Sequence, residues 1–139
     1  MKNLFFLILL FPSILLSFSN DKDKKIDAEL ICIEYYSKGI CNNEYPVYIR
    51  VIYSVQEADI SSLKMKHEFS NGIIATMPIT EIDKKGNIVY GFCSDKQEIK
   101  DFTTVFISKE GLQSNEIIVQ INVPEAKIIA GTAPHTIKK

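Results

Sequence analysis

Apolar and polar side chains alternate in several short runs of this chain, and this period of two constrains the fold more than any other feature. In Pro46–Val55, and again in Glu116–Val123, every second residue is apolar or aromatic. Successive side chains of a strand point to opposite faces of a sheet, so each run is expected to be a strand with one buried face. The seven strands expected are Ala28–Tyr36, Pro46–Val55, Ser62–Phe69, Pro78–Asp83, Ile88–Cys93, Phe102–Ser108 and Glu116–Val123.

Glycine-centred turns separate these runs. In Asp83–Asn87, Gly86 supplies the left-handed residue of a tight hairpin, and Lys109–Gly111 does the same between the last two strands. Ser37–Gly39 and Ser70–Gly72 indicate two further reversals. No stretch of about ten residues carries a helical stripe, and residues 55–63 have room for a single helical turn at most.

Seven short strands in about 100 residues are typical of an antiparallel sandwich. The run Asp101–Glu116 resembles the penultimate strand, turn and last strand of an immunoglobulin-like or fibronectin-type-III-like domain. It has an aromatic strand, a turn with Gly111 and Ser114-Asn115, and then an alternating strand. The resemblance implies an all-β, seven-stranded antiparallel immunoglobulin-like sandwich. It concerns the fold alone, because the chain has no tryptophan and its cysteines do not bracket one.

The first 19 residues have the three parts of a secretory signal. Lys2 gives a positive start, Leu4–Leu16 is an apolar run broken only by Pro12-Ser13, and Ser17–Ser19 offers small residues for cleavage. The apolar run is shorter than the roughly 20 residues that a membrane-spanning helix needs. An uncleaved anchor would be longer, and a core helix rarely lies at the extreme N-terminus. We therefore expect export to the periplasm, the cell exterior or a secretory lumen, with no stable membrane anchor.

This signal sets the expected domain organisation. Residues 1–19 are the signal peptide, residues 20–25 a polar lead, residues 26–125 one sandwich domain and residues 126–139 a flexible tail that ends in two lysines. Loss of Lys2 leaves a mixed, weakly acidic chain, with net charge about −2. Nucleic-acid binding is not expected, because no basic stripe is present.

Three cysteines, Cys32, Cys41 and Cys93, are expected in an oxidising compartment, so one pair should bridge and one should remain. If the strands run up and down, the connections that contain or border Cys41 and Cys93 emerge at the same end of the sandwich. Cys41–Cys93 is therefore the favoured pair, with Cys32–Cys41 as the alternative and another pair or none still open. Cys32 lies in mid-strand, where a reduced cysteine behaves as a small apolar residue.

No catalytic, cofactor-binding or metal-ligating constellation is expected. A cysteine nucleophile needs a nearby histidine. His67 is interpreted as a strand residue at a face boundary, and His135 as a solvated tail residue. Redox, serine-hydrolase and phosphate-binding motifs (Cys-x-x-Cys, Gly-x-Ser-x-Gly and glycine-rich loops) are absent from the sequence, as is a calcium loop. A metal site would require the three cysteines and His67 to converge from distant segments.

Four tyrosines crowd the first two strands and their connection: Tyr35, Tyr36, Tyr45 and Tyr48. If exposed, they would form a sticky patch of the kind that binding surfaces use. The alternative is inward packing together with ordinary coverage of a sheet edge.

These observations favour an exported, non-enzymatic immunoglobulin-like module that binds another extracytoplasmic protein through loops or a sheet edge. A small secreted enzyme or enzyme inhibitor that acts through carboxylates is one alternative. A structural subunit that pairs its tail, residues 126–139, with a neighbour is another. The oligomeric state is left open.

Overall fold

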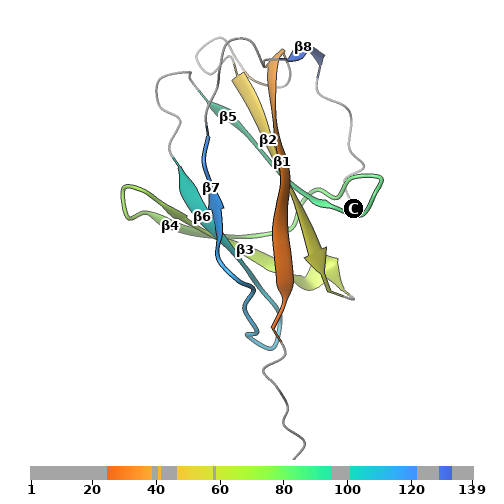
Figure 1. The fold of residues 1–139 in the computed structure, drawn as a ribbon, viewed down its shortest axis with the longest axis vertical. Coiled ribbons are helices and arrows are strands. Elements are labelled where there is room, and N and C mark those ends of the chain that lie inside the picture. Colours follow the sequence, from red (N-terminus) through yellow and green to blue (C-terminus); the bar gives the residue numbers. More distant parts are fainter. Residues whose placement is uncertain are drawn as a thin grey trace, which may run out of the picture.

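Strands in two four-stranded sheets make up most of the part that the computed structural model describes, residues 25–38, 41, 47–57, 59–94, 101–121 and 129–132 (Figure 1). The strands are β1 Asp27–Lys38, β2 Val47–Gln56, β3 Lys64–Phe69, β4 Ile74–Pro78, β5 Ile88–Ser94, β6 Phe102–Ile107, β7 Ile117–Val119 and β8 Ile129–Thr132. A single 3-10 turn, η1 Ile60–Ser62, lies between β2 and β3. This turn confirms that 55–63 holds at most one turn of helix.

The strand orders are β5-β2-β1-β8 in one sheet and β4-β3-β6-β7 in the other. Strands β1 to β7 pair only in antiparallel fashion within these sheets, whereas β8 runs parallel to β1. The predictions of an all-β fold and of two antiparallel layers are confirmed.

The alternation in β2 builds the centre of the core. Val47, Ile49, Val51, Tyr53 and Val55 belong to one buried cluster between the sheets. Their partners from the facing sheet include Leu63, Met65, Phe102, Phe106, Ile117 and Val119. The side chains at these alternate positions are thus removed from water, as the period of two predicts.

Three hairpins share one turn geometry. In each, a glycine adopts positive φ: Gly72 at 82°, Gly86 at 85° and Gly111 at 85°. The glycine N–H donates to the carbonyl three residues earlier, as from Gly86 to Asp83 at 3.1 Å. A side chain would be strained at this backbone conformation, so the predicted turns at these glycines are confirmed.

The expected strand Pro78–Asp83 is wrong in position. The chain forms β4, Ile74–Pro78, directly after the Gly72 hairpin, and Pro78 ends this strand rather than beginning one. Proline has no N–H to donate and is tolerated at sheet edges and strand ends. Beyond it, Ile82 makes only an isolated bridge to Ile88.

The eighth strand, β8, was not predicted. It lies in the segment 126–139 and pairs with β1 of the same chain, next to Tyr36 and Lys38. Its sequence contains Ala130 and Gly131, which have low strand propensity, so the pattern gave no signal. The remaining residues of the expected tail lie outside the described part, as does Gly39. Ser37 and Lys38, which were expected to begin a turn at Gly39, belong to β1 instead.

A bulge in β1 reverses the faces of its side chains. The register shifts between Leu30 and Cys32, so that Leu30 pairs with Tyr53 and Cys32 with Ile52. The extra residue, Ile31, is left 48% exposed. One inserted residue moves every later side chain to the opposite face. Cys32 therefore lies on the outer face and is exposed, in contrast to the predicted apolar environment.

The predicted signal peptide, residues 1–19, and residues 20–24 of the polar lead lie outside the described residues. The described part begins with Lys25, which is exposed. In this part, no helix has the length and apolar character required to span a membrane.

Candidate functional site

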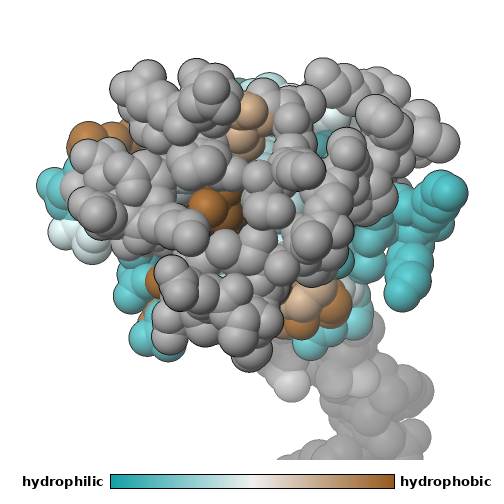
Figure 2. Space-filling model, turned by 90° about the horizontal axis from the view of Figure 1, so that it is seen from above, coloured by the Kyte–Doolittle hydropathy of each residue, from teal (hydrophilic) through white to brown (hydrophobic). Residues whose placement is uncertain are grey.

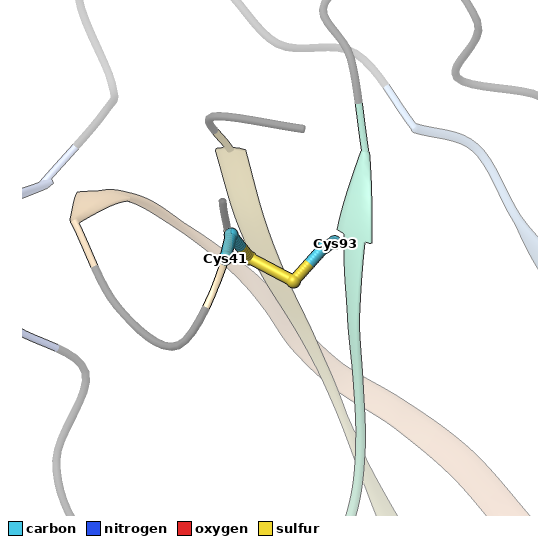
Figure 3. Close-up of a disulfide and its surroundings, with 2 residues drawn as sticks. All are labelled: Cys41 and Cys93. Carbon is cyan, nitrogen blue, oxygen red and sulfur yellow. A yellow bond between two sulfur atoms is a disulfide. The ribbon is translucent and has the colours of Figure 1, made fainter. Parts of the chain in front are cut away.

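A disulfide joins Cys41 to Cys93, with Cα atoms 5.6 Å apart (Figure 3). Cys93 lies on β5, and Cys41 precedes β2 in the connection from β1. The favoured pairing is therefore confirmed, and Cys32 is a free thiol. The bridge holds the β1–β2 connection against the same sheet rather than linking the two sheets.

The outer face of β5-β2-β1 is closed around Arg50, which is only 3% exposed. Its guanidinium donates to Glu34 on β1 at 2.8 Å and lies 3.5 Å from a carboxylate oxygen of Glu81. Tyr36 donates its hydroxyl proton to the same oxygen of Glu34 at 2.9 Å. A buried guanidinium is tolerated when carboxylates compensate its charge. We call Glu34, Tyr36, Tyr48, Arg50 and Glu81 the Arg50 cluster.

Charge pairing in this cluster is stronger than the effect of burial on Arg50. Burial disfavours the charged guanidinium, but the hydrogen bond with Tyr36 and the charges of Glu34 and Glu81 raise the Arg50 pKa above its usual value. Burial, followed by the hydrogen bond to Glu34, raises the pKa of Tyr36. Burial, followed by the charge of Glu81, raises the pKa of Tyr48. The tyrosines thus stay neutral and the arginine stays charged at neutral pH.

The exposed tyrosine patch is not found. Tyr35, Tyr36 and Tyr48 are all buried, and Tyr45 lies outside the described residues. Tyr35 packs into the core between the sheets, whereas Tyr36 and Tyr48 pair across β1 and β2 on the outer face. Tyr48 also fills the space above Gly91 on β5, where any added Cβ would collide with its ring. Inward packing, the alternative interpretation, accounts for Tyr35. Tyr36 and Tyr48 are instead buried on the outer face, where their rings pair.

His67 is fully buried in the core, not at a face boundary as the sequence suggested. Its Nδ1 lies 2.9 Å from the hydroxyl of Thr104, which also hydrogen-bonds the hydroxyl of Tyr53 at 2.9 Å. The ring stacks on Tyr90 with centroids 4.3 Å apart. This polar chain connects β3 and β6 of one sheet to β2 of the other. The sequence signal for the burial of His67 was its spacing of two residues from Met65 and from Phe69, which puts the three side chains on one face of the strand.

The buried environment keeps His67 neutral. Desolvation lowers its pKa to about 4, because the imidazolium would lose its hydration without gaining a counter-charge. Among the described residues, Nε2 of His67 has no hydrogen-bond partner. A histidine enclosed in this way does not reach a substrate.

The outer face of β4-β3-β6-β7 is open, in contrast to that of the other sheet. One cross-strand row runs over all four strands: Ile74 pairs with Glu68, Glu68 with Thr103, and Thr103 with Ile118. Ile74 is 56% exposed and Ile118 is 68% exposed. The next two rows place Lys66 and Lys64 beside Val105 and Ile107. Apolar and charged side chains therefore alternate over this face.

Two adjacent hollows lie on this open face and share Glu68 and Thr103. The first, of about 360 Å³, is lined by Glu68, Phe69, Ser70, Gly72, Asp101, Phe102, Thr103 and Ile118. The second, of about 300 Å³, is lined by Lys25, Lys66, Glu68, Thr103, Val105, Gln113, Ser114, Asn115 and Glu116. The first combines apolar surface with two carboxylates and has no cationic lining residue, so it suits a cation with an apolar stem.

Away from this face, Ile31 on β1 is an exposed large hydrophobic residue. Seen from above, hydrophilic side chains project at the sides of the described part (Figure 2). Cys32 lies on the exposed part of β1, where burial and the charge of Glu34 raise its thiol pKa. A protonated thiol is a poor nucleophile. Within the described ranges, no group of three or more histidine, cysteine or acidic side chains is arranged to hold a metal ion.

No protein-family model, curated protein or solved structure matches this chain. The interpretation of its function therefore depends on the geometry of the sandwich and its two outer faces.

Proposed function

We propose that this protein is an exported, non-enzymatic immunoglobulin-like module that binds another extracytoplasmic protein. The binding surface is the open outer face of β4-β3-β6-β7, centred on Ile118 and the first hollow. The observation that carries the proposal is the 68% exposure of Ile118 beside that hollow, since the corresponding face of the other sheet is closed by the Arg50 cluster.

The strand order supports the immunoglobulin-like part of this proposal. Strands β1, β2 and β5 share one sheet, and β3, β6 and β7 share the other, which is the division found in immunoglobulin domains. Strand β4 extends the second sheet beside β3. This extra strand widens the open face to four strands.

The lining of the first hollow indicates the chemistry of the partner. Ile118 provides exposed apolar surface, and Glu68 and Asp101 provide negative charge. A lysine or arginine side chain matches both, because its aliphatic stem packs on apolar surface while its charged end meets a carboxylate. We infer that the partner is a protein that presents a basic side chain from an otherwise apolar surface.

Export is supported by two independent features. Residues 1–19 have the composition of a secretory signal, and Cys41 is bonded to Cys93. Disulfides of this structural kind form and persist in oxidising compartments. A non-enzymatic role is supported by the enclosure of His67 in the core and by the raised pKa of the Cys32 thiol.

Site-specific photo-crosslinking tests this surface. Ile118 is replaced by a photoreactive phenylalanine analogue in the full chain, which is expressed with its leader in cells that export it. We expect one discrete covalent adduct after irradiation, in which the crosslinked peptide of the partner contains lysine or arginine. The matched control carries the analogue at Gln56, which is exposed on the other sheet. Adducts of equal yield at both positions, or none at position 118, would overturn the proposal.

Two further variants test the charge contribution. Glu68→Gln removes one negative charge from the hollow and should reduce the adduct yield several-fold, with a smaller effect at high salt. Asp59→Asn removes the same charge from an exposed turn before η1 and should leave the yield unchanged. An equal reduction by both variants would exclude a specific basic contact.

A further inference from the structure

The sheet edges of this sandwich differ in how they are covered. Edge strand β5 is capped by the residues before it: Val89 donates to the carbonyl of Glu81 at 3.0 Å, and Ile82 bridges Ile88. One end of strand β1 is covered by β8, which pairs with it. At the other end of β1, the side chain of Asn115 hydrogen-bonds the backbone of Ala28. The middle of β1 carries the bulge. Bulges and covering segments are devices that prevent edge-to-edge association.

Strand β4 lacks these devices in the described part of the chain. It is five residues long and pairs with β3 without a register shift. The other edge of the same sheet, β7, is only three residues long. Strand β4 also contains no charged residue, and Ile74, Thr76 and Pro78 are exposed. An uncharged, regular edge strand is a template for another strand.

The hydrogen-bond pattern shows which backbone groups of β4 are available. Phe69 donates to the carbonyl of Ile73 at 2.9 Å. This bond fixes which residues of the hairpin direct their backbone groups to the paired strand and which direct them away. From that pair onward, Ala75 and Met77 direct their backbone groups to β3, while those of Ile74 and Thr76 point away from it. Pro78 falls on the outward-pointing set, where its missing N–H costs no bond to β3.

We propose that β4 pairs with β4 of a second copy, antiparallel about a two-fold axis at Thr76, so that the two sheets become continuous. Such an interface uses the same patch on both copies. The pairing places Thr76 opposite Thr76 of the second copy, where each donates to the other. Ile74 lies opposite Pro78 of the second copy on the outer face, where the Ile74 N–H donates to the Pro78 carbonyl and no bond returns, because proline has no N–H. Ala75 lies opposite Met77 on the inner face. Small and large side chains thus meet on both faces.

Charge does not oppose this pairing. The nearest cations on the outer face are Lys66 of each copy, one strand behind β4. Three strand spacings separate the two, about 14 Å, which exceeds the screening length of about 10 Å at 0.1 M salt. No acidic or basic side chain of one β4 meets a like charge of the other. This self-complementarity favours a second copy over an unrelated strand as the occupant.

Sedimentation of the purified protein over a range of concentrations tests the proposal. The short interface predicts a weak dimer, with Kd above about 1 μM, rather than an obligate one. Thr76→Pro removes an outward N–H, and Thr76→Lys places two positive charges face to face at the axis. Each should raise Kd at least tenfold, and both variants should be checked for native circular dichroism. Thr103→Lys, on the internal strand β6 of the same face, is the matched control and should dimerise normally.

Hydrogen exchange provides a readout that does not depend on any variant. Exchange of the Ile74 and Thr76 amides should slow as the concentration rises through Kd, while the Gly72 amide should not respond. A single-chain mass up to about 1 mM, or a dimer unaffected by both Thr76 variants, would overturn the proposal. The result is separable from the proposed function, because the photo-crosslink at position 118 should survive Thr76→Lys and the dimer should survive Ile118→Lys.

Discussion

Tyr36, Tyr48 and Arg50 are buried on the outer face of β5-β2-β1, whereas Ile74 and Ile118 are exposed on the outer face of β4-β3-β6-β7. The first face buries polar groups and the second exposes apolar ones. Carboxylates of Glu34 and Glu81 make the burial of Arg50 possible, and no comparable group closes the other face in the described residues. We therefore propose that the first face stabilises the domain and that the second binds the partner.

In the core the contrast between the two sheets is reversed. The sheet that is closed outside presents mainly apolar side chains to the core, while the open sheet contributes the buried polar pair of His67 and Thr104. Arg50 is held charged by its neighbours, and His67 is held neutral by the lack of them. The two groups should therefore respond differently to mutation and to pH.

The disulfide lies at the sheet whose outer face is closed, and its removal should have the largest effect on the free energy of unfolding. Replacing both Cys41 and Cys93 by alanine opens a loop of about 50 residues and should lower the free energy of unfolding by about 4 kcal/mol in the chain-entropy model. Urea denaturation of the variant and of the reduced wild type measures this loss. A loss below about 1 kcal/mol would show that the bridge is incidental.

Removing the central cation should be the next largest effect. Arg50→Met removes the cation that faces the carboxylates of Glu34 and Glu81 and should lower the free energy of unfolding by about 3 kcal/mol. The same substitution at Lys66, on the open face, should change stability by less than about 0.5 kcal/mol. Equal losses at the two positions in urea denaturation would contradict the contrast between the faces.

Acid should destabilise the protein through His67. Its pKa is about 4 in the folded state and 6.5 in the unfolded state, so the unfolded chain binds the proton more readily between these values. Stability is therefore complete above pH 6.5 and falls as the pH is lowered toward 4, by roughly 3 kcal/mol. His67→Gln should lack this component when urea denaturation is compared from pH 7 to pH 4. Parallel pH profiles of the two proteins would refute the assignment.

Substitution on the open face should have the smallest effect on stability. Ile118→Ser removes an exposed side chain and should change the free energy of unfolding by less than about 0.5 kcal/mol. Thermal denaturation measures this change. A loss above about 2 kcal/mol would mean that Ile118 serves the fold rather than a partner.

Local sequence signals predicted much of the fold. The alternation in β2 and the glycines at 72, 86 and 111 located strands and hairpins, because both depend on residues within a few positions of one another. The expected strand directions favoured the Cys41–Cys93 pairing among the alternatives, and the structure contains it. The position of β4 was missed, since Ile74–Pro78 and the residues after it carry similar β-forming character. Strand β8 was missed because its pairing with β1 is set by tertiary structure.

Periodicity and composition are carried by neighbouring residues, so they were sufficient to predict the all-β class of the fold, and they also predict a leader. Which outer face is closed depends on how the strands pack together. A single bulge at Ile31 turned Cys32 and Glu34 to the outer face of β1, next to Arg50 on β2. Burial of Tyr36, Tyr48 and His67 likewise depends on strands far apart in the chain. The period of two identifies the inner face of a strand, but the exposure of the outer face is a property of the assembled sheets.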